Sequence, residues 1–274
     1  MATTGLYARM AIVGTLLFAL YAVAAVVVMG VFGWPLWLVL IASVLFVGVQ
    51  YKIGTWAALR SVGAEPFPSE RYPEVERRVE ALADQMDLEM PDLKIARMGV
   101  PNAFAVGRRG AGTVVVSEEL LQTLTVDEAE GVLAHELSHI DNRDVVMMVL
   151  GQGVASIVAI VAQWAVLLTG DNELADFFLA IVVGQIVQLL VMLLVFAISR
   201  YREYVADSDA ARAIGGGEPL ASALEKISSG TRQARDSEID AQVNALCIFG
   251  EKQGLARLLA THPPVEKRID RLRA

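Results

Sequence analysis

Four long uncharged stretches constrain this chain more than any other feature. Residues 11–30, 34–51, 145–168 and 177–198 contain no Asp, Glu, Lys or Arg. Each is close to the ~20 residues that an α-helix needs to cross the roughly 30 Å hydrocarbon core of a bilayer. Helices buried inside soluble proteins are usually shorter and carry some charge. The sequence therefore predicts an α-helical membrane protein with four transmembrane helices.

The apolar stretches divide the chain into four segments. Residues 1–60 form a predicted N-terminal transmembrane hairpin, with spans near 11–30 and 34–51, and residues 145–198 form a second, inserted hairpin. Between and after them lie two polar segments, 61–144 and 199–274. We expect these two segments to make one catalytic domain, because only a few residues separate each of them from the inserted hairpin.

The polar segments carry mixed patterns, which predict a mainly α domain of α+β type with a small β-sheet. Residues 61–69 contain a glycine and two prolines and are interpreted as a linker. Helical periodicity is found over 72–86, 126–142, 219–228, 239–260 and 265–272, and short strands are predicted over 93–97, 102–106 and 113–116. Residues 107–112 are interpreted as the turn between the last two strands.

Basic residues are confined to one side of this arrangement. The connectors 31–33 and 169–176 contain no Lys or Arg, so all 23 basic residues fall in 1–10, 52–144 and 199–274. Basic residues favour the cytoplasmic face of a membrane. We therefore expect both termini and both polar segments to lie in the cytosol.

Residues 125–139 predict a helix that carries metal chemistry. Thr125 and Glu128 have the spacing of a capping box at its start. His135 and His139 lie one turn apart, so both imidazoles can bind one metal ion. Glu136 is placed to take a proton from a water molecule at the metal rather than to bind the metal itself. The alternative is a helix whose histidines only cap or pack.

A third ligand is expected because a catalytic zinc usually has three protein ligands and one open position. Glu203 is the best candidate, since it follows the fourth apolar stretch just as His139 precedes the third. Asp207 lies one helical turn later, where it could accept an N–H from a ligand imidazole and orient the ring. Spacing alone leaves a solvated charge as an equally good interpretation of Glu203.

Several motifs together identify a family. The segments HELSHIDNRD (135–144), SRYREYVAD (199–207) and THPP (261–264) occur in that order, and PNAFAVG (101–107) stands upstream. This combination resembles the HtpX family of membrane-integrated zinc metalloproteases, and the resemblance covers nearly the whole chain.

The resemblance implies a gluzincin-type site. One zinc ion per chain is expected on His135, His139 and Glu203, with Glu136 as catalytic base and Asp207 as supporting carboxylate. It also implies proteolytic quality control under stress: cleavage of misfolded or surplus membrane proteins at the cytosolic surface of a prokaryotic plasma membrane. The lipid bilayer and unfolded proteins are thus the expected partners.

Two further sets of residues take weaker roles. The segment Asn102, Ala103, Phe104 and Ala105 matches the family's edge strand beside the active site, where an extended substrate could pair through backbone bonds. An ordinary edge strand is the alternative. His262 could stabilise an oxyanion or cap the helix that follows Pro263, and we favour the structural role.

Other functions are weighed against this one. The net charge of −8 and the absence of a basic, aromatic-interleaved patch give no support for nucleic-acid binding. Within enzymes, the alternative is a CAAX prenyl-protein protease, which shares the two zinc motifs but resembles a larger chamber with more spans. From another class, the alternative is a catalytically silent membrane adaptor. The oligomeric state is left open by the sequence.

Overall fold

The computed structural model describes residues 2–171, 174–235 and 262–274. The chain divides into two compact units, here called the membrane unit (Met1–Ile53 with Met147–Ser199) and the polar unit (Gly54–Val146 with Arg200–Ala274). The predicted helix over 239–260 lies outside the described residues.

Four helices of the described chain are long and apolar enough to cross a membrane, as predicted. They are α1 (Ala2–Phe32), α2 (Leu36–Ser61), α6 (Asp144–Thr169) and α7 (Leu174–Ala213). The last helix continues without a break beyond the apolar run. Its polar end carries Glu203 and Asp207, so both are helical residues of the same element.

Small residues allow close packing inside the membrane unit. Leu17 of α1 packs with Ala155 of α6 and with Val191 and Val195 of α7. A Cβ added at Gly151 would lie 2.9 Å from Cγ2 of Val195, so glycine lets α6 and α7 approach. Close approach at small residues is typical of helix association in lipid.

The polar unit contains a four-stranded sheet of order β1-β2-β4-β3. Its strands are β1 (Glu65–Pro66), β2 (Asp92–Ala96), β3 (Ala103–Arg108) and β4 (Ala111–Ser117). Strand β2 runs parallel to β4, whereas β1 against β2 and β3 against β4 are antiparallel. Three strands were predicted, but β1 lies in the segment interpreted as a linker, where Pro66 weakened the strand pattern. The β3–β4 turn is also tighter than predicted, because pairing continues to Arg108 and Ala111.

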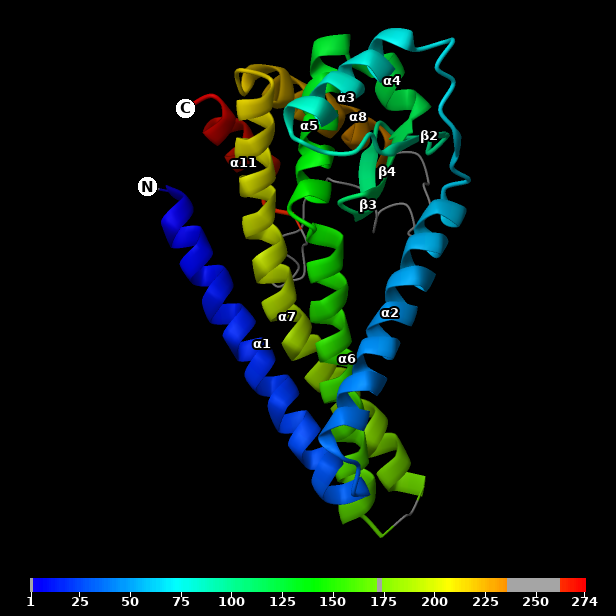
Figure 1. Ribbon diagram of the computed structural model, residues 1–274, viewed down its shortest axis with the longest axis vertical. Coiled ribbons are helices and arrows are strands. Elements are labelled where there is room, and N and C mark those ends of the chain that lie inside the picture. The colour runs from blue at the N-terminus through cyan, green and yellow to red at the C-terminus, as the bar shows by residue number, and fades with distance from the viewer. Residues whose placement is uncertain (1, 172–173, 236–261) are drawn as a thin grey trace. The chain divides into compact units, whose positions relative to one another are not determined.

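Five further helices of the described chain belong to the polar unit. They are α3 (Pro73–Gln85), α4 (Glu118–Thr123), α5 (Val126–Asp141), α8 (Glu218–Arg235) and α11 (Val265–Leu272). Figure 1 shows α3, α5 and α8 close to the sheet, and α5 contacts α3, α8, β3 and β4. The core between them is built from aliphatic side chains, among them Val79, Val114, Leu133, Leu137 and Ile227.

Local sequence explains why α5 begins and packs where it does. The predicted capping box is present: Thr125 Oγ1 accepts from the Glu128 N–H, and the Glu128 carboxylate accepts from the Thr125 N–H. At Gly131 a Cβ would lie 2.8 Å from the Leu220 nitrogen, so this glycine lets the backbone of α8 approach α5. The buried faces of α5 fix its rotation about its own axis, and hence the direction of its histidines.

Candidate active site

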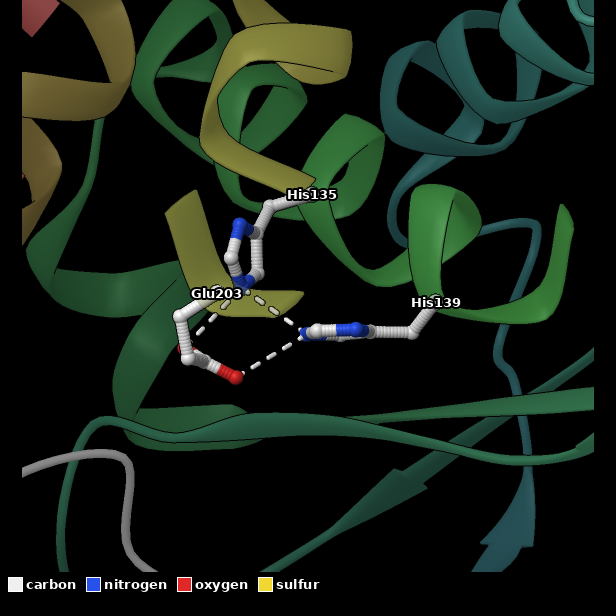
Figure 2. A group of neighbouring side chains, drawn as sticks. All are labelled: His135, His139 and Glu203. Atoms are coloured by element: carbon white, nitrogen blue, oxygen red, sulfur yellow. Dashed lines mark hydrogen bonds and ion pairs between the residues drawn. The ribbon is translucent and has the colours of Figure 1, made fainter. Parts of the chain in front are cut away.

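Two histidines of α5 point to a common position. His135 and His139 lie one helical turn apart, and their Nε2 atoms are 3.1 Å from each other. Figure 2 shows both rings turned toward Glu203, which comes from α7. The His135 side chain is 3% exposed and that of His139 is 15% exposed, so the second ring is the more accessible.

Glu203 completes the group that the sequence predicted. Its Oε2 lies 3.6 Å from His135 Nε2, and its Oε1 lies 3.4 Å from His139 Nε2. Ligand atoms bound at 2.0–2.1 Å to a tetrahedral zinc ion lie about 3.3–3.4 Å apart. Glu203 Oε2 is buried and accepts no hydrogen bond, although His262 Nδ1 at 2.8 Å and Arg268 Nη1 at 3.1 Å lie within ion-pair distance of it. These three residues therefore fit a metal ion in both donor type and spacing.

Each histidine is held from behind by a carboxylate. His135 Nδ1 lies 3.0 Å from Asp207 Oδ1, and His139 Nδ1 lies 2.6 Å from Asp144 Oδ2. A proton on each Nδ1 would donate to the carboxylate and leave the Nε2 lone pair for a metal, the usual arrangement around histidine ligands. Asp207, for which a supporting role was predicted, lies beside His135. Asp144 was given no role in the sequence analysis, although it closes the first motif.

Two buried arginines contact the carboxylates of this site, and the sequence patterns did not predict either of them. Arg268 of α11 is 1% exposed and binds both oxygens of Asp207, at 2.9 and 2.6 Å. Arg202 of α7 forms an ion pair with Asp144. The sequence offered one weak signal for each: Arg202 adjoins Glu203, and Arg268 stands beside Ile269 on a predicted amphipathic helix. Arginines at such positions are usually solvated, which is why the pattern alone did not single them out.

The buried charges leave a negative site. Glu136, Asp144, Glu203 and Asp207 are all less than 10% exposed, as are Arg202 and Arg268. With the four carboxylates ionised and both histidines neutral, as metal binding requires, the two guanidinium groups compensate only half of the charge, and a net charge of −2 remains. Uncompensated charge is costly inside a protein. A divalent cation between His135, His139 and Glu203 would balance it.

For Glu136 and His139, burial and the neighbouring charges act on the pKa in opposite directions. Burial raises the pKa of the Glu136 carboxyl, although the adjacent His139 and His135 act to lower it. Burial alone lowers the pKa of His139, but the Glu203 carboxylate outweighs it and the pKa is raised overall. A bound cation would act against both shifts, since it repels protons from the same groups.

His262 occupies a different position from the one expected. Helix α11 has Pro264 at its N-cap and no side-chain cap, so the interpretation of His262 as a helix cap is wrong. Its Nδ1 lies 2.8 Å from Glu203 Oε2 instead, with the side chain 29% exposed. His262 thus lies beside the candidate metal-binding group.

The predicted substrate strand is only partly an edge. Asn102 is 2% exposed, its N–H donates to Ser117 Oγ at 2.9 Å, and its carbonyl accepts from the Ser117 N–H at 2.8 Å. These bonds tie Asn102 to the end of β4. Ala103, Phe104 and Ala105 do lie in β3, the last strand in the sheet order, and α5 packs against this strand.

Comparison with known proteins places this site in a family. Residues 69–274 match the family described as Peptidase family M48, and the match includes each of the site residues above. The chain belongs to peptidase family M48. Its relatives agree: the "Protease HtpX homolog" of Halobacterium salinarum is 58% identical over 289 residues, which cover 97% of this chain and 100% of the relative. "Protease HtpX" of Escherichia coli K12 is 36% identical and covers 82% of each chain.

A solved structure supports the fold. Ste24p of S. mikatae superposes with a TM-score of 0.61 at 17% sequence identity, over 98% of this chain and 66% of that longer chain. Together with the four apolar helices, the family makes this M48 chain a multi-pass membrane metalloprotease, as the motifs predicted. Family M48 implies a metal, and His135, His139 and Glu203 form a group in the described chain that is suited to hold one.

Proposed function

We propose that this M48 protein is a zinc-dependent endopeptidase that cleaves misfolded or surplus membrane proteins at the cytosolic surface of a prokaryotic cell membrane. The observation that carries the proposal is the convergence of two Nε2 atoms and the Glu203 carboxylate within 3.6 Å of one another. Two histidines and a glutamate, with a fourth position open, are typical of zinc hydrolases.

The roles of the residues follow from their positions. His135, His139 and Glu203 would hold the zinc, which when bound polarises the scissile carbonyl and lowers the pKa of water. Glu136 follows His135 directly on α5 and would take the proton of the attacking water. The same carboxyl would then donate it to the leaving amine. Asp207 would keep His135 oriented through its Nδ1.

The open edge of β3 would bind the substrate backbone. In an antiparallel pair, residues alternate between those bonded to the partner strand and those directed away from it. Asn102 and Ser117 are bonded to each other, so the alternation directs the backbone groups of Ala103 and Ala105 away from β4. An extended segment can pair with these groups whatever its side chains, which suits a protease of unfolded chains.

The cytosolic orientation rests on the distribution of basic residues. A single cysteine introduced at Asp171, in the Cys247→Ser background, should react with an impermeant thiol reagent added outside intact cells. A single cysteine at Glu70 should react only after the cells are opened. The reverse pattern would contradict a cytosolic site.

The activity is tested with the purified protein loaded with zinc. Glu136→Gln should retain one zinc per chain but lose cleavage of casein and of an unfolded membrane protein. Glu130→Gln makes the same charge change on the same helix, where the side chain pairs with Arg78, and should cleave like the unmodified protein. Loss of zinc in Glu136→Gln would contradict the roles assigned to α5.

The same preparation tests the other two functions. A membrane adaptor would show no zinc-dependent cleavage of any substrate. A prenyl-protein protease would cleave a farnesylated CAAX peptide in preference to casein. Either result would replace the proposed function.

A further inference from the structure

The turn between α5 and α6 brings Asp144, the first residue of α6, into contact with His139. Helix α5 ends at Asp141 and α6 begins at Asp144, and between them Arg143 has φ 55°. A positive φ is unusual for a residue with a side chain and marks a turn that its surroundings hold in place. Here the result is a contact of 2.6 Å between Asp144 Oδ2 and His139 Nδ1.

Arg202 holds this turn from the neighbouring helix. Its guanidinium pairs with the Asp144 carboxylate and donates to the carbonyl oxygens of Asp144 at 3.2 Å and Asn142 at 3.1 Å. Asp144 and Arg202 are 7% and 5% exposed, so solvent hardly competes for these contacts. A planar guanidinium that reaches both side chain and backbone fixes the direction of the carboxylate.

Helix α7 thereby supplies residues near both ring nitrogens of His139. Glu203 lies at Nε2, at 3.4 Å, and its neighbour Arg202 reaches Nδ1 through Asp144. The other histidine has a parallel arrangement, since Asp207 contacts His135 and is held by Arg268.

We propose that Asp144 is a positioning residue: held by Arg202, it keeps the proton of His139 on Nδ1 and turns Nε2 toward the metal. The inference rests on the proposed zinc site and deepens it. Asp144 also stands in the first turn of α6, where an acidic side chain stabilises a helix start. A residue with that role alone would affect folding but not the affinity of the folded protein for metal.

The test separates these two roles by measuring zinc affinity and folding independently. Zinc dissociation constants are determined by competition with a chromophoric chelator, and unfolding temperatures are measured in the presence of the chelator alone. Asp144→Asn should lower the unfolding temperature, because it leaves the buried Arg202 without its anionic partner. In the folded protein it should also weaken zinc binding about 10- to 100-fold, as expected for the loss of a group behind a ligand. Its cobalt-loaded form should show an altered visible absorption band.

A matched control lies on the same turn. Asp141 ends α5 and pairs with Arg109 at 3.4 Å, with its side chain 36% exposed. Asp141→Asn removes the same charge and should bind zinc like the unmodified protein.

A second variant covers the case in which Asp144→Asn does not fold. Arg202→Lys keeps the charge and the Asp144 carboxylate but loses the planar fork, so zinc affinity should fall severalfold with an altered cobalt spectrum. If either folded variant, Asp144→Asn or Arg202→Lys, binds zinc as tightly as the unmodified protein, the inference is overturned. Failure of the unmodified protein to bind zinc would instead overturn the proposed metal site, and the inference with it.

Discussion

Replacing Glu128 with glutamine is expected to destabilise the polar unit and to leave the residues of the candidate metal site unchanged. Glu128 lies in the first turn of α5 and is 7% exposed. Its carboxylate accepts from the Thr125 N–H at 2.8 Å, from Ser222 Oγ at 2.6 Å and from Lys226 Nζ at 2.7 Å. The side chain therefore joins the start of α5 to α8.

The size of the effect follows from the pKa of this carboxyl. Burial acts to raise the pKa, but the bonds from Lys226, Ser222 and Thr125 outweigh it, and the pKa falls from 4.5 to about 2. One pKa unit corresponds to about 1.4 kcal/mol of differential interaction, so ionisation contributes about 3 kcal/mol at neutral pH. Glutamine resembles the protonated carboxyl in size and charge. We therefore expect Glu128→Gln to lose roughly 2–3 kcal/mol of unfolding free energy.

The assay is thermal unfolding in detergent, followed by far-UV circular dichroism. For a chain of this size the loss corresponds to a melting temperature lower by roughly 5–10 °C. Glu225→Gln is the matched control: Glu225 precedes Lys226 on α8, but its side chain is 50% exposed in its pair with Arg273. Exposed ion pairs stabilise little, so this variant should melt close to the unmodified protein.

The dependence on pH gives a second check with a definite sign. Because the folded pKa of Glu128 is depressed, its contribution is complete above about 4.5, the unfolded value, and is lost as the pH falls from there toward about 2. The difference between the unmodified protein and Glu128→Gln should thus be constant between pH 8 and 6. Equal melting temperatures, or a difference that already closes in that range, would refute this reasoning.

Two other predictions concern the third ligand and the packing of α5. Glu203→Ala should abolish stoichiometric zinc binding, whereas Asp207→Ala should weaken it roughly 10- to 100-fold; zinc analysis of both purified variants decides, and full zinc retention in Glu203→Ala would assign the third ligand elsewhere. Gly131→Ala should cost about 1–3 kcal/mol of stability, measured by thermal unfolding, because its Cβ would lie 2.8 Å from the Leu220 nitrogen. Gly216→Ala, with nothing within 4 Å of the added Cβ, should be nearly neutral, and equal melting of the two glycine variants would contradict the packing argument.

Part of the candidate metal site could be predicted from the spacing of residues along one helix, and part of it could not. His135, Glu136 and His139 share one helix, where a separation of four residues places two side chains on one face. Asp144 could not be assigned in the same way, because its contact with His139 depends on the left-handed turn at Arg143. Nothing in the residue types predicts that turn.

The sheet shows the same division. Strands β2, β3 and β4 have alternating or β-branched patterns and were predicted near their observed positions, whereas β1 has two residues, one of them a proline. So short a strand exists because β2 offers it a partner. Pairing of this kind is a property of the assembled sheet and leaves almost no trace in the segment itself.

By itself the sequence determined the four long apolar helices, the helix of the two histidines with its capping box, and the motifs that mark an M48 protease. These features depend on hydrophobic length and on side chains a few residues apart, both of which act locally. Only the tertiary structure decided that Arg268 and Arg202 are buried and hold Asp207 and Asp144 behind the two histidines. An arginine has the same sequence signature in solvent and in a buried ion pair, and its environment is set by residues far away in the chain.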